Sequence, residues 1–404
     1  MTSHRAEVFG GVDTHKQAHV VAAVDSAGRL LGTAQFAADG CGYEQLVCWL
    51  GRWGTVCRVG VEGTGSYGAG LTRHLAAAGI ETVEVNRPNR QARRRQGKSD
   101  IVDAEAAARA ALNGDAVGVP KSGDGCVEAI RTLSVARRSA VKARTVAANQ
   151  LNAVAVTAPE RFRARLRGLS TTEMVQVCAR WRPAVADDPA VRAAKQAMRA
   201  LATRCRSLTA EIDGLDAELL ALCHQANPAL LGAVGVGADV ASALLVAAGD
   251  NPSRMRSEAS FAALCGASPT QASSGSTIRH RLNRGGNRQA NNALWRIATT
   301  RLRSDQRTID YAQRRQAEGK TRREIIRCLK RHIAREIYRL LTDPPQVPHG
   351  ADLRRQRIRH GLTIADSAQA LNTYTSRISE LERSRYHNRE LAERYQQHLD
   401  QISD

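Results

Sequence analysis

The 404-residue sequence predicts a mixed α/β domain at the N-terminus, followed by segments that are almost entirely helical. Two observations predict the first domain: three short apolar segments open the chain, and helical and strand patterns then alternate up to about residue 112. A third observation is the alternation of four- and three-residue steps between apolar positions from Leu201 to Leu222, which is typical of a coiled coil. A chain of this length is expected to form roughly two to four domains.

Each element of the first domain has its own signal in the sequence. Apolar runs that stop at turn residues predict strands at Val8–Val12, His19–Val24, Leu30–Phe36, Val56–Val61 and Glu81–Val85. Helical patterns lie between and after these strands, at Tyr43–Trp53, Gly68–Ala78 and Ala104–Leu112. Three strands followed by alternating helix and strand describe a mixed sheet of the ribonuclease-H type.

Four carboxylates lie at related places in this predicted topology. Asp13 ends the first strand, Glu62 ends the fourth, and Asp100 and Asp103 open the helix that closes the domain. Because the carboxyl ends of neighbouring strands converge, and the following helix can reach the same edge, these side chains are expected to hold two Mg²⁺ ions. The ordinary alternative is an N-capping Asp100 with a first-turn Asp103, beside two solvated strand-end acids.

The charge distribution indicates a polyanionic partner. The net charge is +20, and residues 279–339 contain 18 Lys or Arg against five Asp or Glu. A coding bias toward Arg would explain the choice of Arg over Lys, but not the local loss of acids. Nucleic acid is therefore the expected partner, and the basic residues predicted to contact it are Arg93, Arg94, Arg95, Lys98, Arg279, Arg281, Arg284 and Arg288.

Cysteine usage and hydrophobicity indicate the compartment. The nine cysteines are scattered without a CxxC pair, so neither a disulfide framework nor a zinc site is supported, which fits a reduced cytoplasm. No apolar run approaches the ~18 residues of a membrane span, and the polar N-terminus does not have the pattern of a signal peptide. We therefore expect a cytoplasmic protein without a membrane partner.

The middle of the chain is predicted to be helical. A helix from Val127 to about Leu151 precedes a proline-containing segment that the patterns do not assign. The coiled-coil seam follows, and it consists of Leu201, Cys205, Leu208, Ile212, Leu215, Leu219 and Leu222. The seam has two interpretations: it joins two copies of the protein, or it packs within one chain against the earlier helix.

Two loops in the next segment carry chemical signals. The glycine-rich stretch Leu230–Gly237 precedes the apolar helix Ala238–Ala248 and resembles a helix-hairpin-helix element, whose backbone N–H groups can bind a phosphate. Ser273, Ser274 and Ser276 lie in the loop that opens the basic region. A serine hydroxyl can attack a phosphodiester when cations offset the developing charge, but residue chemistry alone does not select one of the three.

A proline-rich linker at residues 343–350 precedes a small C-terminal module. Its helical patterns lie at Leu353–His360, Leu362–Leu371 and Thr375–Arg383. The last two resemble the helix-turn-helix of Cro and phage repressors, although Asn372 stands where glycine is usual and Ser367 where an apolar residue is usual. In that motif the second helix enters the major groove, here with Thr375, Ser376 and Arg377 facing the DNA. The alternative is a plain helical hairpin.

Together these residues resemble one family, the DEDD transposases of bacterial insertion sequences, known as the IS110 family. The resemblance covers Val8 to about Leu341, and its three acidic motifs match in order and spacing at Gly11–Lys16, Val61–Gly65 and Lys98–Ala104. The family's glycine-rich and serine motifs are matched by Ala233–Gly237, with Ala233 in place of proline, and by Ser274-Gly275-Ser276. The repressor-like tail lies outside the family's usual core.

The resemblance implies a division of the chain and a role for each part. A RuvC-like DEDD domain is expected at 1–120, a helical or coiled-coil segment at 121–226, a serine-containing transposase domain at 227–342, a linker at 343–350 and a helix-turn-helix at 351–404. Asp13, Glu62, Asp100 and Asp103 would hold Mg²⁺, and Ser274 would be the nucleophile of DNA strand exchange. The implied partners are element-end and target DNA, a noncoding guide RNA, and further copies of the chain in a dimer or tetramer at the bacterial nucleoid.

Two other functions fit parts of the sequence. One is a RuvC-like junction endonuclease that uses water in place of the serine. The other is a non-enzymatic helix-turn-helix regulator with a decayed catalytic domain, which the intact acids disfavour. A DEDD exonuclease fits less well, because that class carries Asp-x-Glu on its first strand, whereas Asp13 is followed by Thr14 and His15.

Overall fold

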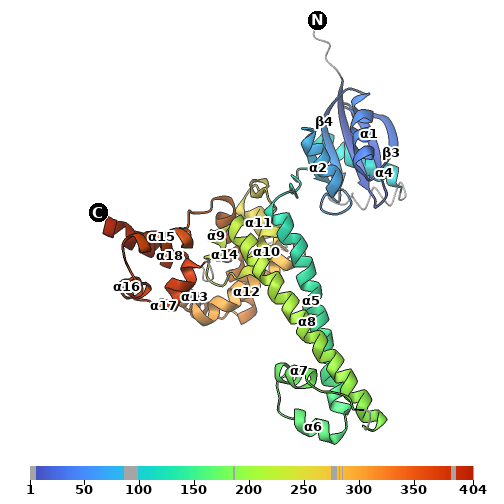
Figure 1. The fold of residues 1–404 in the computed structure, drawn as a ribbon. Coiled ribbons are helices and arrows are strands. Elements are labelled where there is room, and N and C mark those ends of the chain that lie inside the picture. Colours follow the sequence, from blue (N-terminus) through green and yellow to red (C-terminus); the bar gives the residue numbers. More distant parts are fainter. Residues whose placement is uncertain are drawn as a thin grey trace. The chain divides into compact units, whose positions relative to one another are not determined.

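The computed structural model describes residues 6–85, 99–184, 187–273, 280–281, 283, 285–383 and 388–403. The chain forms two compact units. The first consists of Met1–Glu128 with Ala247–Ala263, and the second consists of Ala129–Val246 with Leu264–Asp404. In Figure 1 the sheet of the first unit is blue, and the helices of the second run mainly from green to red.

The five strands of the first unit form one mixed sheet in the order β3-β2-β1-β4-β5. The strands are β1 Glu7–Thr14, β2 Ala18–Asp25, β3 Leu30–Ala37, β4 Thr55–Glu62 and β5 Thr82–Val85. β2 is antiparallel to both of its neighbours, whereas β1, β4 and β5 run parallel to one another. The predicted α/β class with a ribonuclease-H-type mixed sheet, followed by helical segments, is therefore confirmed.

Helices cover both faces of this sheet. α1 (Gly40–Gly51) and α2 (Ala69–Ala77) bury apolar side chains against one face, and Leu50 of α1 lies over Gly10 of β1. α4 (Asp100–Asn113) packs on the other face, over Gly11. A Cβ atom added to Gly11 would lie 2.0 Å from the backbone nitrogen of Ala108, so only glycine permits this approach. The same close packing brings the N-terminal end of α4 to the carboxyl ends of β1 and β4.

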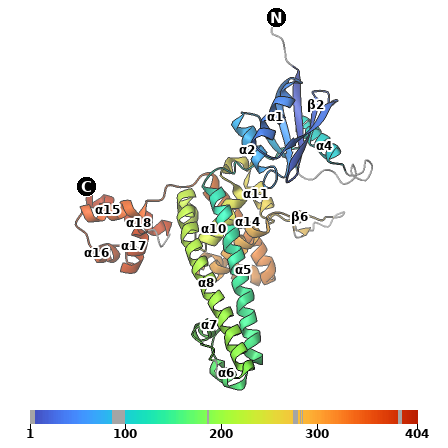
Figure 2. The ribbon, with the colours of Figure 1, turned by 45° about the vertical axis from the view of Figure 1, so that its right-hand side comes forward.

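Two long helices of the second unit lie side by side. α5 (Cys126–Thr157) and α8 (Pro189–Ala226) are adjacent in Figures 1 and 2, and α6 (Glu160–Leu166) and α7 (Thr171–Ala179) connect them. Arg137 of α5 forms an ion pair with Asp216 of α8. Every seventh residue of α8 from Met198 to Leu219 is fully or almost fully buried, so this half of the seam packs within one chain. Its other positions, Leu201, Leu208, Leu215 and Leu222, are only half-buried.

Shorter elements follow α8 along the chain. They are α9 Pro228–Leu231, α10 Ala238–Ala248, the 3₁₀ turn Pro252–Arg254, α11 Glu258–Leu264, β6 Thr270–Gln271, β7 His280–Arg281, α12 Arg288–Ser304, α13 Gln306–Ala317 and α14 Arg322–Thr342. α12 packs against α14, and Arg301 of α12 forms a bidentate ion pair with Glu336 of α14. None of the helices in the described part of the chain is long and apolar enough to cross a membrane.

The C-terminal tail contains the three predicted helices and one more. These are α15 Gly350–Arg359, α16 Ile364–Ala370, α17 Thr375–Glu382 and α18 Arg389–Ser403. Leu353, Ile378 and Tyr395 meet in a small apolar core. Asn372 takes a left-handed conformation (φ 49°) in the turn between α16 and α17, a conformation that asparagine adopts more readily than most residues. The DNA-binding role of these helices stays a prediction.

A buried polar network explains the unusual serine of α16. Arg357 forms a bidentate ion pair with Glu382 at 2.6 and 2.9 Å, and both side chains are almost fully buried. The Tyr395 hydroxyl donates to Glu382 at 2.8 Å and lies 3.3 Å from the hydroxyl oxygen of Ser367. Ser367 is therefore part of this network, and burial raises the pKa of Tyr395 above its ordinary value.

Replacing Glu382 with glutamine is expected to destabilise the tail by about 3–5 kcal/mol, because Arg357 would remain buried without a counter-charge. Hydrogen exchange on the full chain, read from peptides within residues 350–383, measures the local free energy of opening. The matched control is Glu380→Gln, whose ion pair with Arg377 is solvent-exposed and is worth about 1 kcal/mol at most. Equal protection in the two variants would contradict this account of the network.

Candidate functional site

Two of the four predicted acids lie at the ends of adjacent parallel strands. Val12 of β1 pairs with Val61 of β4, and Asp13 and Glu62 are the next residues on the two strands. The Thr14 hydroxyl donates a hydrogen bond to the Glu62 carbonyl oxygen at 2.8 Å, which joins the two strand ends. Because side chains alternate along a strand, both acids project to the face that α4 covers.

The other two acids begin α4. Ser99 is the N-cap residue, and its carbonyl oxygen accepts a hydrogen bond from the backbone N–H of Asp103 at 3.0 Å. Asp100 and Asp103 therefore both lie in the first turn, and the alternative that made Asp100 the N-cap is wrong. Asp103 is 5% exposed, whereas Asp100 lies at the surface.

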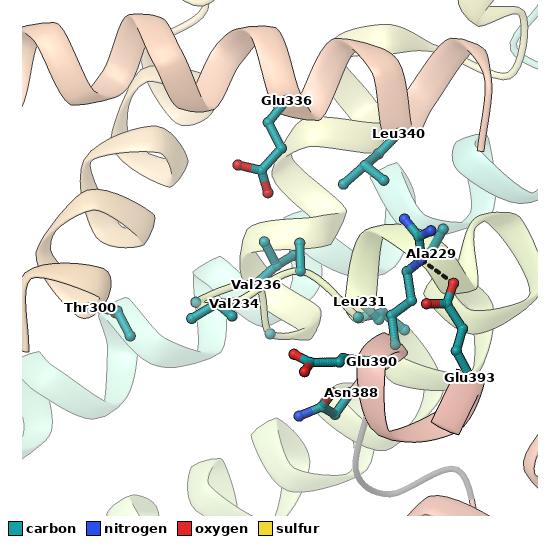
Figure 3. Close-up of a pocket in the computed structure, with 15 residues that line it drawn as sticks. Ala229, Leu231, Val234, Val236, Thr300, Glu336, Leu340, Asn388, Glu390 and Glu393 are labelled. Atoms are coloured by element: carbon teal, nitrogen blue, oxygen red, sulfur yellow. Dashed lines mark hydrogen bonds and ion pairs between the residues drawn. The ribbon is translucent and has the colours of Figure 1, made fainter. Parts of the chain in front are cut away.

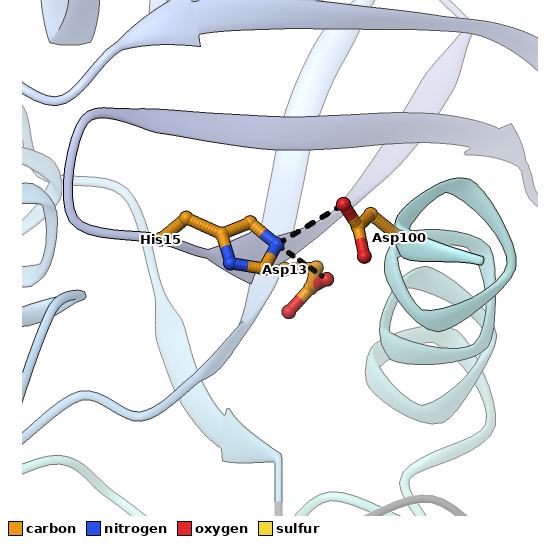
Figure 4. Close-up of side chains that lie close together, drawn as sticks. All are labelled: Asp13, His15 and Asp100. Atoms are coloured by element: carbon orange, nitrogen blue, oxygen red, sulfur yellow. Dashed lines mark hydrogen bonds and ion pairs between the residues drawn. The ribbon is translucent and has the colours of Figure 1, made fainter. Parts of the chain in front are cut away.

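His15 connects the strand acid to the helix acid, as Figure 4 shows. Its Nε2 atom lies 3.2 Å from Oδ2 of Asp13 and 3.3 Å from Oδ2 of Asp100. Each of the three residues offers one ligand atom, and these atoms all lie within 4.8 Å of one another. A cluster of this size and composition is compatible with a single divalent cation.

The carboxylates at this edge of the sheet repel one another. Burial raises the pKa of Asp13 above its ordinary value, His15 lowers it, and the negative charges of Asp100 and Asp103 raise it. A buried carboxylate with two other carboxylates nearby is stabilised by a cation. Carboxylate oxygens are also the ligands that Mg²⁺ prefers. The donor set therefore fits a divalent metal ion.

The structure places the predicted acids at one edge but does not bring all of them equally close. Asp13 and Asp100 share the cluster, and Asp103 is near enough to perturb the pKa of Asp13. Glu62 lies at the same edge of the sheet, outside the cluster of three. His15 was not among the metal ligands predicted from the sequence. His15 lies two residues after Asp13, and residues i and i+2 of an extended segment project to the same side. This spacing could have predicted that His15 lies near Asp13.

Several predicted site residues fall outside the described part of the chain. These are Ser274, Ser276, Arg93, Arg94, Arg95, Lys98, Arg279 and Arg284. The remaining predicted contacts with nucleic acid are described, and all of them are exposed at the surface: Arg281, Arg288, Thr375, Ser376 and Arg377. Ser273, the neighbouring candidate nucleophile, is exposed as well.

A cavity of about 800 Å³ lies beside the glycine-rich turn (Figure 3). The turn Ala233–Gly237 forms part of its wall, and Glu336, Glu390 and Glu393 also line it. Glu336 is paired with Arg301, and Glu393 is paired with Arg389. The three carboxylates outnumber the one cation of the lining, Arg389, which disfavours a phosphate in this cavity. The helix-hairpin-helix role of the turn stays a prediction.

Comparison with known proteins places two parts of the chain in related families. A family model for the IS110 type of DEDD transposases, described as "Transposase", matches residues 10–158, which contain all four acids. A second model, "Transposase IS116/IS110/IS902 family", matches residues 228–313, which contain the serine motif. A curated relative from Streptomyces coelicolor, the "Insertion element IS110 uncharacterized 43.6 kDa protein", is 33% identical over 146 residues. That match covers 34% of this chain and 36% of the relative.

Proposed function

This chain belongs to the IS110 family of transposases, and from that premise we propose that it is the DNA transposase of an insertion sequence. It would cleave and exchange DNA strands in a reaction that depends on Mg²⁺. The observation that carries the proposal is the meeting of Asp13, His15 and Asp100 at one edge of a ribonuclease-H-type sheet. Such an enzyme would meet its DNA at the nucleoid.

In the proposed mechanism Asp13, Glu62, Asp100 and Asp103 would hold two Mg²⁺ ions. A divalent cation at this site would supply the positive charge that offsets negative charge developing on the scissile phosphate. The chain positions the ligands by rigid elements: β1 and β4 carry two of them, and the first turn of α4 carries the others. His15, between Asp13 and Asp100, helps to hold these two carboxylates together.

Ser274 is the proposed nucleophile. Its hydroxyl oxygen forms a bond to phosphorus, one P–O bond of the DNA breaks, and the serine proton ends on the departing DNA hydroxyl. The resulting serine–phosphate link keeps the energy of the phosphodiester for rejoining to another strand. The serine motif and the acids belong to separately matched segments of the chain, so two subunits can supply the two halves of one active site.

The partners of this enzyme are proposed from charge and packing. The 18 basic residues of segment 279–339 would bind the backbone of element-end DNA and target DNA, and of a noncoding guide RNA. The half-buried leucines of α8 support pairing of two copies through the coiled coil, within a dimer or tetramer. The exposed Thr375, Ser376 and Arg377 of α17 support a helix-turn-helix contact of the tail with DNA.

A strand-transfer assay on element-end DNA tests the proposed function. Cleaved and rejoined DNA is expected with Mg²⁺, none with EDTA, and a loss of product when co-purified RNA is digested. A covalent protein–DNA adduct should form in the complete reaction. Cleavage without an adduct would favour the junction endonuclease, and binding without any cleavage would favour the regulator.

A further inference from the structure

A cavity of about 370 Å³ lies between α12 and α14 in the second unit, and we call it the α12–α14 cavity. Its volume falls within the ~300–1,000 Å³ that is usual for small-ligand sites. One helix face supplies Arg288, Asn291 and Trp295, and the opposite face supplies Arg323, Ile326, Arg327 and Lys330. The spacing of three, four and seven residues on each helix aligns these side chains toward the same space.

A fixed polar pair, Asn291 and Lys330, lines the cavity. The Asn291 amide donates to the carbonyl oxygens of Cys265 and Gly266 at 2.7 and 3.1 Å, which orients its side-chain oxygen toward Lys330. The Lys330 ammonium donates to that oxygen at 3.0 Å. Lys330 is only 8% exposed, and burial together with the nearby Arg327 lowers its pKa. The hydrogen bond to Asn291 holds Lys330 in place, although burial of its ammonium group costs desolvation free energy.

One exposed acid, Glu324, lies near the cations of the cavity; hydrogen bonds with Thr321 and the charges of Lys320 and Arg327 lower its pKa. Two arginines outside the cavity are neutralised: Arg301 of α12 pairs with Glu336, and Arg315 of α13 pairs with Glu318. Within the described part of the chain, no carboxylate forms an ion pair with Arg288, Arg323, Arg327 or Lys330. Four basic residues around one cavity, one of them buried, give it an excess of positive charge that favours an anionic ligand.

An aromatic surface lies beside these cations. Trp295 lines the cavity and is 46% exposed. Asn291 and Thr299 lie one helical turn before and after it. Both are less exposed than Trp295, and both donate side-chain hydrogen bonds to backbone carbonyl oxygens. An indole ring among arginines is the arrangement with which proteins bind unpaired bases: the ring stacks on the base, and the arginines contact the phosphates. A free inorganic anion would not require the aromatic surface.

We propose that the α12–α14 cavity binds one unpaired nucleotide of a single-stranded nucleic acid. Trp295 stacks on the base, Arg323 and Arg327 contact the flanking phosphates, and the Lys330–Asn291 pair faces the edge of the base. A base within a duplex is stacked on its neighbours and does not reach such a site. The inference rests on the proposed function only in taking nucleic acid as the partner.

Binding of labelled oligonucleotides to the full chain tests this inference. Fluorescence anisotropy would compare single-stranded DNA, single-stranded RNA and duplex DNA of the same sequence at fixed salt concentration. Trp295→Ala is expected to weaken single-strand binding by about tenfold, whereas duplex binding changes by less than about twofold. Trp295→Phe should retain most of the affinity, because a phenyl ring also stacks. The matched control is Trp53→Ala, which removes a tryptophan of similar exposure (40%) from the first unit.

Tryptophan fluorescence gives a second readout that does not depend on a folded alanine variant. Single-stranded oligonucleotide should quench the wild-type emission, and Trp295→Phe should lose that quenching. Weaker binding of Trp295→Ala to single-stranded DNA or to single-stranded RNA supports the proposed site and identifies which nucleic acid it binds. Equal binding of the wild type and Trp295→Ala to both nucleic acids overturns the proposal. This binding test is independent of strand transfer. Absence of Mg²⁺-dependent cleavage by the wild type would contradict the proposed function, but it would not change the comparison of oligonucleotide binding between the wild type and Trp295→Ala.

Discussion

Replacing Asp103 with asparagine is expected to reduce Mg²⁺-dependent strand cleavage by at least about 100-fold while leaving DNA binding intact. Asp103 is buried at the first turn of α4 and acts electrostatically on Asp13. Asparagine has the same shape but no charge, so it weakens the hold on a cation without opening a cavity. Cleavage rates on element-end DNA, measured across a Mg²⁺ titration, provide the test.

The control for this substitution is Asp115→Asn, which removes an exposed acid just beyond the end of α4. Its rate should equal that of the wild type, because residue 115 is not part of the acidic edge. Circular dichroism of both variants checks that the sheet and helices persist. Wild-type cleavage by Asp103→Asn would remove this residue from the proposed metal site.

Replacing Ser274 with alanine is expected to abolish strand exchange, by roughly 10⁴-fold or more, together with the covalent protein–DNA adduct. The hydroxyl oxygen is the atom proposed to bond to phosphorus, and alanine has no substitute for it. Denaturing gel electrophoresis of reactions with end-labelled DNA detects the adduct directly.

The neighbouring serines supply the controls for this substitution. Ser273→Ala and Ser276→Ala should both retain the adduct, since the family motif selects Ser274. An adduct that disappears only in Ser273→Ala would move the nucleophile by one residue. An adduct that persists in all three variants would contradict serine chemistry in this loop.

The sheet and the helix that carries the acids were predictable from the sequence because local patterns specify them. Each strand is a short apolar run that ends at turn residues. The segment after Asp100 is rich in alanine, which strongly favours a helix. The order of the strands and the meeting of Asp13 with Asp100 then follow from the topology of one fold class. Local signals and tertiary structure agree for the described strands of this sheet and for α4.

Other features depend on contacts between residues that are distant in the sequence. Ser367 departs from the helix-turn-helix pattern, which has an apolar residue at this position. Its side-chain hydroxyl contacts the hydroxyl of Tyr395, 28 residues away, and the sequence pattern does not reveal this contact. Trp295 and Lys330 lie on separate helices, and their common cavity depends on how α12 and α14 pack. The seam of α8 was ambiguous for the same reason: an apolar stripe does not state whether its partner helix is in the same chain.

Metal binding by the full-length protein is the most direct test of the central claim, that the acids at the edge of the sheet hold a divalent cation. Isothermal titration of Mg²⁺ into the wild type and into Asp103→Asn measures this without requiring DNA or cleavage. We predict saturable binding by the wild type and a loss of affinity of at least about tenfold in the variant. Equal binding by the two proteins, or no saturable binding by the wild type, would contradict the account.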